Sequence, residues 1–139
     1  MMRCGIILSY KKDFDTYYLI VYSKKSRKWG FPKGGADENE SYKDTALREF
    51  YEETGYKFIY SKKMSKKFQY RNNLYFIVYI SCPEKELIET DIPDSDEILE
   101  KKWIAKQDLL KIEEEKCNMG LKQWILFLNK KNSLNKKIS

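Results

Sequence analysis

Residues 34 to 56 read GGADENESYKDTALREFYEETGY and predict one charged helix between two glycine-containing turns. The helix is expected from Ser41 to Thr54, because serine is a favoured N-cap and Gly55 is a usual C-terminal stop. Asp44, three residues after Ser41, approximates a capping box. At about 100° per residue, four charged side chains share one stripe beside an apolar arc. The stripe consists of Arg48, Glu49, Glu52 and Glu53, and the arc of Ala46, Leu47, Phe50 and Thr54.

The stripe carries three carboxylates, and Arg48 is its only internal counter-charge. Like charges at this helical spacing repel each other by about a few tenths of a kcal/mol per pair. A ligand that neutralises Glu49, Glu52 and Glu53 together would remove that cost. Divalent cations are therefore the expected ligands of this helix.

The apolar runs outside this helix predict a sheet. Cys4 to Tyr10 and Thr16 to Ser23 are rich in β-branched and aromatic residues and predict neighbouring strands. After the helix, Tyr56 to Ser61 predicts a strand, and Leu74 to Ser81 predicts a central strand that Pro83 ends. The remaining expected elements are a loop over residues 83–96 with one short helical turn, a strand containing Trp103, a short helix over residues 107–112 and an amphipathic helix containing Trp124. This order indicates helices on both faces of a mixed sheet.

Length and composition fit one globular domain within the 139 residues. We expect this domain to occupy residues 1–130 and a basic, mobile tail to occupy residues 131–139. Hydrophobic residues make up 42% of the chain, which excludes a disordered composition. Cys4, Cys82 and Cys117 lack metal-type spacing, and neither a secretory signal nor a membrane-length apolar run is recognised. A reducing compartment, the cytosol or the nucleus, is therefore expected, and the cytoplasm ranks first.

The residue types present and absent limit the chemistry. The net charge of +6 favours a polyanionic partner such as nucleic acid, polyphosphate or an inositol phosphate. A lysine-rich surface without a specific function would carry the same charge, and composition leaves both interpretations open. The chain contains no histidine, which excludes Ser-His-Asp and Cys-His catalysis and a histidine base.

Two segments before the helix are candidates for binding phosphate. Lys24 to Gly30, KKSRKWG, predicts a cationic loop that is either a solvated turn or a phosphate-binding rim. Trp29 in this loop has two open interpretations, packing in the core or stacking on a base. Residues 31–35, FPKGG, predict a turn whose glycines let main-chain groups approach a ligand. The candidate substrate-binding residues are Lys24, Lys25, Arg27 and Lys33.

The spacing within residues 34–56 resembles the Nudix box. The matching positions are Gly34, five residues, Glu40, seven residues, Arg48-Glu49-Phe50, one residue, Glu52-Glu53, one residue, and Gly55-Tyr56. The resemblance implies an α/β/α sandwich (an α+β fold) with a mixed central sheet, the catalytic helix on one face and the C-terminal helix on the other. It also implies a Mg²⁺- or Mn²⁺-dependent hydrolase. Members of the family split nucleoside diphosphates linked to another moiety by attack of water on phosphorus.

The same resemblance assigns roles to individual residues. The implied metal ligands are Gly34, through its carbonyl, and the catalytic carboxylates Glu49, Glu52 and Glu53. This set agrees with the preference of Mg²⁺ for oxygen ligands. Arg48 is expected to orient the glutamates, and Glu40 to tie the preceding loop to the helix.

A general base is expected outside the box. Glu97 precedes the Trp103 strand, where several members of the family carry a functional glutamate, and we expect it to be catalytic. Asp96 and Glu100 could do the same work, and an ordinary surface carboxylate at position 97 is an equally open interpretation.

Resemblance to branches of the family ranks the substrates. WGFPKG, REFYEETG and the spacing of Glu97, Ile98 and Trp103 resemble mRNA-decapping Nudix enzymes, in the form found in large DNA viruses. Cationic loops, including Lys62 to Lys67, would suit an RNA backbone, and a tyrosine or tryptophan could stack on a methylguanine base. PKGG before an acidic segment equally resembles hydrolases of diphosphoinositol and diadenosine polyphosphates. Cap hydrolysis ranks first, these polyphosphates second, and free or oxidised nucleotides third. A Nudix fold that binds RNA or nucleotide without catalysis is the remaining alternative, against which the intact glutamates argue.

Overall fold

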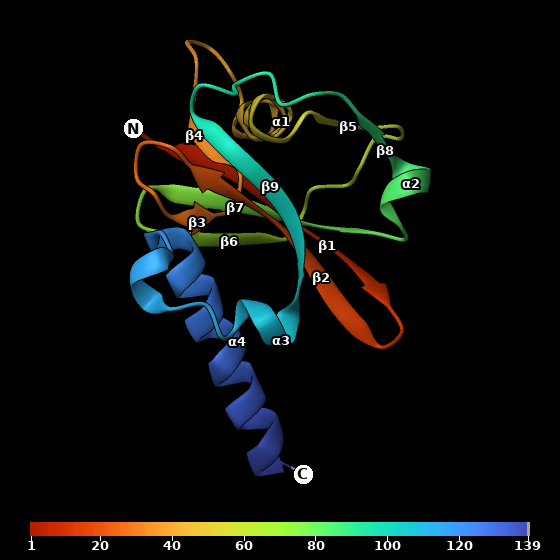
Figure 1. The fold of residues 1–139 in the computed structure, drawn as a ribbon, viewed down its shortest axis with the longest axis vertical. Coiled ribbons are helices and arrows are strands. Elements are labelled where there is room, and N and C mark those ends of the chain that lie inside the picture. Colours follow the sequence, from red (N-terminus) through yellow and green to blue (C-terminus); the bar gives the residue numbers. More distant parts are fainter. Residues whose placement is uncertain (139) are drawn as a thin grey trace.

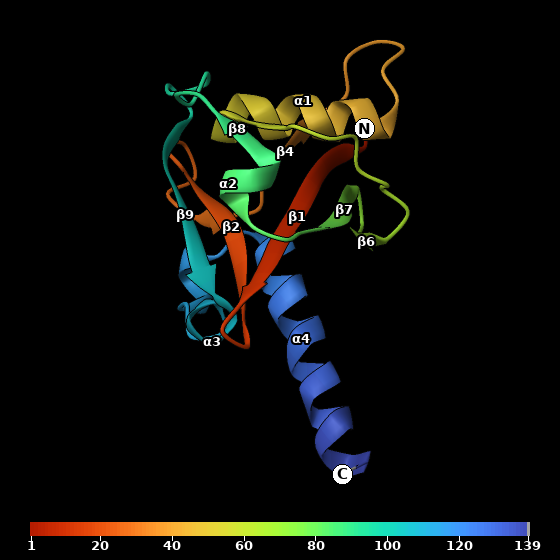
Figure 2. The ribbon, with the colours of Figure 1, turned by 90° about the vertical axis from the view of Figure 1, so that its right-hand side faces the viewer.

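The computed structural model describes the backbone of residues 1–138 and the side chains of residues 1–134. A mixed sheet of seven strands lies between helix α1 (Tyr42–Thr54) on one face and helix α4 (Met119–Ile138) on the other (Figures 1 and 2). The expected α/β/α sandwich is therefore confirmed. The strands of this sheet are β1 (Arg3–Lys12), β2 (Asp15–Ser23), β3 (Trp29–Gly30), β4 (Lys33–Gly35), β6 (Lys67–Tyr70), β7 (Asn73–Ile80) and β9 (Ile98–Ala105). The smaller elements are β5 (Tyr56–Phe58), α2 (Pro83–Glu86), β8 (Leu87–Glu89), α3 (Lys106–Leu109) and a 3₁₀ turn η1 (Glu114–Lys116).

Strand β1 organises the main sheet, whose order is β3-β2-β1-β7-β6. It pairs with β7 in parallel, from Arg3 opposite Asn73 to Tyr10 opposite Ile80, and with β2 antiparallel. The short strand β4 pairs with the start of β1, where Arg3 lies opposite Gly35, and β9 pairs with β2. Because β4 precedes the loop that enters α1, this pairing brings the first residues of β1 next to the charged helix.

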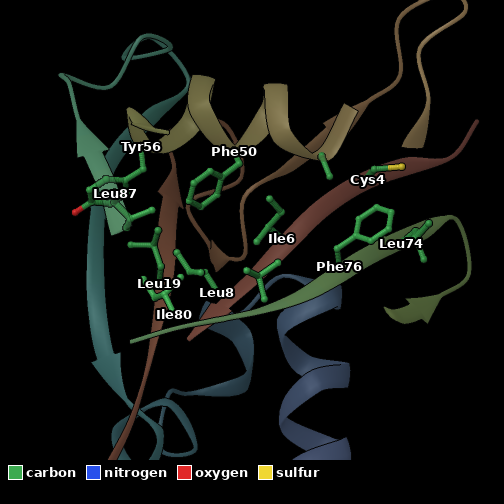
Figure 3. Packing of buried hydrophobic residues seen from close by; sticks show 12 residues of the cluster. Cys4, Ile6, Leu8, Leu19, Phe50, Tyr56, Leu74, Phe76, Ile80 and Leu87 are labelled. Atoms are coloured by element: carbon green, nitrogen blue, oxygen red, sulfur yellow. The ribbon is translucent and has the colours of Figure 1, made fainter. Parts of the chain in front are cut away.

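Alternation along β1 creates a core on each face of the sheet. Cys4, Ile6 and Leu8 point toward α1 and pack in the cluster that contains Phe50 (Figure 3). Ile7 points to the opposite face, into a second cluster under α4. Burying each such large apolar side chain contributes about 1.5–3 kcal/mol. The two clusters therefore fix α1 and α4 against one rigid sheet.

Two segments differ from the sequence-based expectation because they pair with distant strands. Residues 33–35 form strand β4 instead of part of a turn, since their backbone pairs with residues 3–5 of β1. Within the loop expected over residues 83–96, α2 is the predicted helical turn, but Leu87–Glu89 form β8 and pair with β5. Neither pairing leaves a local pattern in the sequence.

The last helix is longer than predicted. α4 continues through Ile138 and so includes residues 131–138, which were expected to belong to a tail. Neither glycine nor proline occurs after Gly120, so no helix-breaking residue interrupts these turns. The short helix expected over residues 107–112 begins one residue earlier and ends at Leu109. Among the described residues, no helix is long and apolar enough to cross a membrane.

Candidate active site

Helix α1 is fixed at both ends by the predicted caps. The Ser41 hydroxyl accepts a hydrogen bond from the Asp44 backbone N–H at 3.1 Å. Gly55 adopts a φ of 77°, a left-handed conformation that costs glycine little, and its N–H donates to the Tyr51 carbonyl at 2.8 Å. Since Phe50 is buried beneath the helix, the rotation of α1 is set and the carboxylate stripe faces β4.

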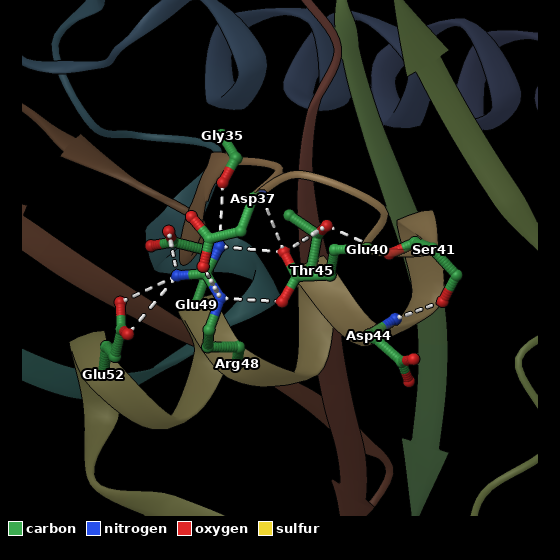
Figure 4. A network of polar contacts seen from close by, with 9 residues as sticks. All are labelled: Gly35, Asp37, Glu40, Ser41, Asp44, Thr45, Arg48, Glu49 and Glu52. Atoms are coloured by element: carbon green, nitrogen blue, oxygen red, sulfur yellow. Dashed lines mark hydrogen bonds and ion pairs between the residues drawn. The ribbon is translucent and has the colours of Figure 1, made fainter.

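Arg48 holds the stripe together (Figure 4). Its Nη1 donates to Glu49 Oε1 at 2.9 Å and to Glu52 Oε2 at 3.2 Å. Its Nη2 donates to the Gly35 carbonyl at 2.8 Å, and its Nε donates to Glu40 Oε2 at 2.9 Å. The planar guanidinium therefore connects strand β4, the loop before α1 and two carboxylates of the helix, which a point charge such as lysine could not do.

Glu40 ties the loop before α1 to the helix. Its Oε1 accepts hydrogen bonds from the Asp37 backbone N–H at 3.0 Å, from Thr45 Oγ1 at 2.8 Å and from Arg48 Nη2 at 3.0 Å. These donors, that of Arg48 above all, lower the pKa of Glu40 to about 2. Glu40 is thus an ionised anchor for Arg48 throughout the physiological pH range.

Glu49 lies directly against the backbone of β4. A Cβ placed on Gly34 would stand 2.2 Å from Glu49 Cδ, so any other residue at position 34 would displace this carboxylate. Burial raises the pKa of Glu49, and the hydrogen bond from Arg48 offsets part of that effect. Gly34 does not adopt a positive φ, so its backbone conformation does not require glycine. Glycine is needed there because the Glu49 carboxylate lies so close to the Gly34 backbone.

Glu53 is the most buried carboxylate of the stripe, with 9% of its surface exposed. It accepts a hydrogen bond from the Lys33 backbone N–H at 3.2 Å. Burial raises the pKa of Glu53 to about 8, and the nearby charge of Glu49 acts in the same direction. Burial also lowers the pKa of the Lys33 side chain, to which the charge of Arg3 contributes. A buried carboxylate and a poorly solvated ammonium thus lie side by side.

One cavity of about 650 Å³ joins Glu53 to the predicted base. Glu97 lines it from the residue before β9, although its position in the sequence is distant from α1. The other polar side chains come from the start of β1, the end of β2 and the loop after it, β4 and the residue before α4. They are Arg3, Ser23, Lys25, Ser26, Lys28, Lys33 and Asn118. A lining that combines carboxylates with several cations is suited to a metal-bound polyphosphate.

Backbone hydrogen bonds hold the segment that carries Glu97. The Lys24 N–H donates to the Glu97 carbonyl at 2.7 Å, and the Asp94 N–H donates to the Glu52 carbonyl at 2.9 Å. The segment is therefore fixed both to the cationic loop and to the end of α1. Repulsion from Glu97 adds to burial in raising the pKa of Asp94. Asp96 and Glu100, the alternative bases, do not line the cavity.

The structure brings together only part of the predicted cationic set. Lys25 and Lys33 line the cavity, whereas Lys24 and Arg27 do not. Sequence reasoning did not identify Arg3, Asn118 or Asp94, and it included Lys28 only as part of the cationic loop. Arg3 reaches the site because β1 pairs with β4, and Asn118 does so because its N–H donates to the Trp29 carbonyl at 2.8 Å.

Trp29 packs on the protein itself. Its ring centroid lies 5.1 Å from that of Tyr22, and Lys102 Nζ lies 4.3 Å from the Trp29 centroid. Among the described residues that line the cavity, Phe31 is the sole aromatic one, and only 1% of its surface is exposed. The cavity therefore presents charge and hydrogen-bonding groups to a ligand instead of an open aromatic face.

The stripe fits a divalent cation by its chemistry, although its side chains do not yet converge. Within the described part of the chain, no three acidic, cysteine or histidine side chains already form a metal-binding group. Glu49 and Glu52 turn toward Nη1 of Arg48, whereas Glu53 lines the cavity. Their oxygens are the ligands that Mg²⁺ and Mn²⁺ prefer, and buried Glu53 lacks full charge compensation. If Glu49 and Glu52 turned from Nη1 of Arg48 toward a cation, Arg48 would keep its hydrogen bonds from Nε to Glu40 and from Nη2 to the Gly35 carbonyl.

Comparisons with known proteins agree with this geometry. The chain is 53% identical over 59 residues to the m7GpppN-mRNA hydrolase dcap-2 of Caenorhabditis elegans, covering 41% of this chain and 7% of that protein. It is 54% identical over 35 residues to the RNA pyrophosphohydrolase of Bartonella bacilliformis, covering 25% and 21%. Its fold is similar to that of the crystal structure of a C. elegans Ap4A hydrolase binary complex, with a TM-score of 0.58, 20% identity and coverage of 92% and 97%. The chain thus matches only a small share of the length of either curated relative. Since the model of the NUDIX domain family matches residues 6–125, the chain belongs to this family.

Proposed function

We propose that this chain is a metal-dependent pyrophosphohydrolase that cleaves the 5′ cap of mRNA and releases m⁷GDP. The observation that carries the proposal is the shared cavity, in which Glu53 and Glu97 face Lys25 and Lys33. In that arrangement, Glu53 would bind the cation and Glu97 would act as the general base. The lysines would bind the phosphate chain. The catalytic unit is a single Nudix domain over residues 1–130, acting in the cytoplasm.

The proposed metal ligands are the carboxylates of α1 and the backbone of β4. Glu49, Glu52 and Glu53 would hold Mg²⁺ or Mn²⁺, together with the Gly34 carbonyl. Bound there, the cation would neutralise the pyrophosphate, lower the pKa of attacking water and stabilise the leaving oxygen. The contact of Glu49 with Gly34 and the burial of Glu53 support this assignment.

Arg48 and Glu40 act by positioning. Arg48 fixes the direction of Glu49 and Glu52, and ionised Glu40 fixes Arg48. Because Arg48 already contacts Glu40, Glu49, Glu52 and Gly35, few of its donors remain for a substrate. Its role is to keep the carboxylates within reach of the same cation.

Glu97 is the proposed general base. It lines the same cavity as Glu53, and its backbone is held by the Lys24 N–H. From this position its carboxylate can take the proton of a water that attacks phosphorus. Asp96 and Glu100 are less suitable, since neither lines the cavity.

The phosphate chain would lie among the cations opposite these carboxylates. Lys25, Lys28, Lys33 and Arg3 line the cavity from three different segments of the chain. Each can donate charge-assisted hydrogen bonds to phosphate oxygens. Lys33 is held next to Glu53, so it is the cation best placed to meet a phosphate close to the metal.

Similarity to proteins that act on RNA 5′ ends supports the choice of substrate. The 59-residue match to the decapping enzyme and the 35-residue match to the RNA pyrophosphohydrolase motivate capped RNA as the first candidate. The second candidate is a diphosphoinositol or diadenosine polyphosphate. A specific observation favours it, namely that the described lining of the cavity carries four cations but no exposed aromatic ring for a methylguanine base.

A substrate panel tests the proposal. Purified protein is incubated with Mn²⁺ or Mg²⁺ and capped RNA, diadenosine polyphosphate or diphosphoinositol polyphosphate, and the products are separated by chromatography. We expect release of m⁷GDP from capped RNA. Cleavage of the diphosphoinositol substrate without any m⁷GDP would show that the cap assignment is wrong. Binding of RNA or nucleotide without turnover of any member of the panel would indicate a non-catalytic module, against which the three intact glutamates argue.

A further inference from the structure

A second cavity, which the proposed catalytic arrangement does not use, lies between the sheet and the middle of α4. Its volume is about 780 Å³, and we call it the α4 groove. Four lysines from four different segments line it, and none of the described residues in its lining is acidic. The four lysines and the two exposed aromatic residues of the lining are Lys11, Lys66, Lys106, Lys131, Tyr79 and Phe127.

Two aromatic rings of the α4 groove are accessible, unlike the buried Phe31 ring of the active-site cavity. Tyr79 is 59% exposed and Phe127 is 43% exposed. Lys66 Nζ lies over one face of the Tyr79 ring, 5.3 Å from its centroid, so a cation and a largely exposed ring occur together. Alternating lysines and exposed rings are the usual means by which proteins bind single-stranded nucleic acid without sequence preference.

The distance between the groove and the active-site cavity sets the length of RNA that is needed to contact the lysines of both. Arg3 lines the active-site cavity and Lys11 lines the groove, and eight residues of strand separate them by about 26 Å. Along α4, Asn118 lines the cavity and Lys131 lines the groove, about 20 Å apart. A longer RNA chain whose 5′ end lies at Glu53 can span this distance to the lysines of the groove.

We propose that the α4 groove binds the single-stranded body of an RNA whose 5′ end occupies the active-site cavity. The lysines neutralise the sugar–phosphate backbone, and Tyr79 and Phe127 stack on bases. This inference rests on the proposed function for the identity of the substrate. Binding of RNA to the groove is nevertheless measurable apart from hydrolysis.

The test compares two double variants with the same change in net charge. Lys66→Gln/Lys131→Gln alters the groove, whereas Lys43→Gln/Lys85→Gln alters exposed lysines on α1 and α2 that do not line it. Binding of an uncapped RNA of about 30 nucleotides is measured by fluorescence anisotropy over a range of salt concentrations. The four groove lysines should contribute about −2.8 to the slope of log K against log salt of the unaltered protein. The groove variant should reduce it by about 1.4, and the control variant should leave it unchanged.

Tyr79→Ala tests stacking separately. We expect RNA binding to weaken by roughly five- to a hundredfold, because stacking of one base on an aromatic side chain contributes that much. Hydrolysis of a cap dinucleotide should not change in any groove variant, whereas kcat/KM for long capped RNA should fall.

Three results would overturn the inference. The first is equal loss of RNA binding in the groove variant and the control variant. The second is a loss of cap-dinucleotide hydrolysis that matches the loss with long RNA. The third is groove-dependent binding to vesicles of anionic phospholipid without binding to RNA. If cap hydrolysis itself fails while groove-dependent RNA binding persists, the proposed function is wrong and the groove assignment stands.

Discussion

Replacing Glu53 by glutamine tests the electrostatic cost of burying this carboxylate separately from its proposed role as a metal ligand. In the folded, metal-free protein, burial raises the pKa of Glu53 from 4.5 to about 8. The unfolded chain releases this proton near pH 4.5, whereas the folded chain keeps it up to about pH 8. Between these values the folded state binds more protons, so the stability of the metal-free protein must fall as pH rises. Glu53→Gln cannot ionise and should lack this dependence.

The size of the effect follows from the same two pKa values. At about 1.4 kcal/mol per pH unit, the interval from 4.5 to about 8 sets a ceiling of roughly 5 kcal/mol. Between pH 5 and pH 8 the unaltered protein would then lose roughly 3 kcal/mol relative to Glu53→Gln. Water entry and rotation of the side chain relieve part of this cost, so we expect about 1–3 kcal/mol. For a chain of this size that corresponds to about 3–10 °C in Tm.

The assay is urea unfolding in EDTA at pH 5 and at pH 8. Glu84→Gln, an exposed carboxylate on α2, is the matched control for the change in charge. The stability gain of Glu53→Gln over the unaltered protein should be small at pH 5 and should appear at pH 8, and Glu84→Gln should show no such gain. A gain of Glu53→Gln that is the same at both pH values would refute the reasoning. Because a bound cation must displace the same proton, Mn²⁺ affinity of the unaltered protein should also rise over this pH range.

Further predictions concern the other parts of the site. Gly34→Ala should lower kcat more than tenfold with little change in Tm, because the added Cβ displaces only the flexible end of Glu49; unchanged kcat would contradict the proposed role of that carboxylate. Arg48→Lys should weaken Mn²⁺ binding about 10–100-fold in calorimetry, since lysine cannot hold Glu40 and the glutamates at once. Glu97→Gln should lower kcat about 10²–10⁴-fold in steady-state assays, whereas Asp96→Asn should have little effect; a loss below tenfold for the former would exclude an essential base. Removal of metal by EDTA should abolish turnover, and added Mn²⁺ or Mg²⁺ should restore it.

Local patterns in the sequence predicted helix α1 well. Ser41 and Gly55 cap α1 as expected, because both caps depend on residues within one turn of the helix end. The angular order of Arg48 and the glutamates also follows from helical geometry alone. The contact between Gly34 and Glu49 could be expected only from the resemblance to the family, since no local rule links a strand to a helix fifteen residues later.

The cationic side of the site was predicted only in part, because it depends on pairing between distant segments. Arg3 enters the cavity through the pairing of β1 with β4, and Asn118 enters through its hydrogen bond to Trp29. In the cationic loop, sequence alone could not tell which side chains turn inward. Arg27 adopts a φ of 57°, which reverses the chain, and Lys28 faces the cavity while Arg27 does not. Glu97 could be named from the sequence, but its place in the same cavity as Lys33 required the fold.

The most direct test of the central claim, that the stripe of α1 holds the catalytic cation, is Mn²⁺-dependent hydrolysis by Glu52→Gln/Glu53→Gln. The assay uses the panel substrate that the unaltered protein cleaves fastest, and circular dichroism confirms that the variant is folded. The account predicts loss of metal-dependent turnover and of Mn²⁺ binding in a protein with an unchanged spectrum. Turnover within tenfold of that of the unaltered protein would contradict the assignment of the metal to these carboxylates.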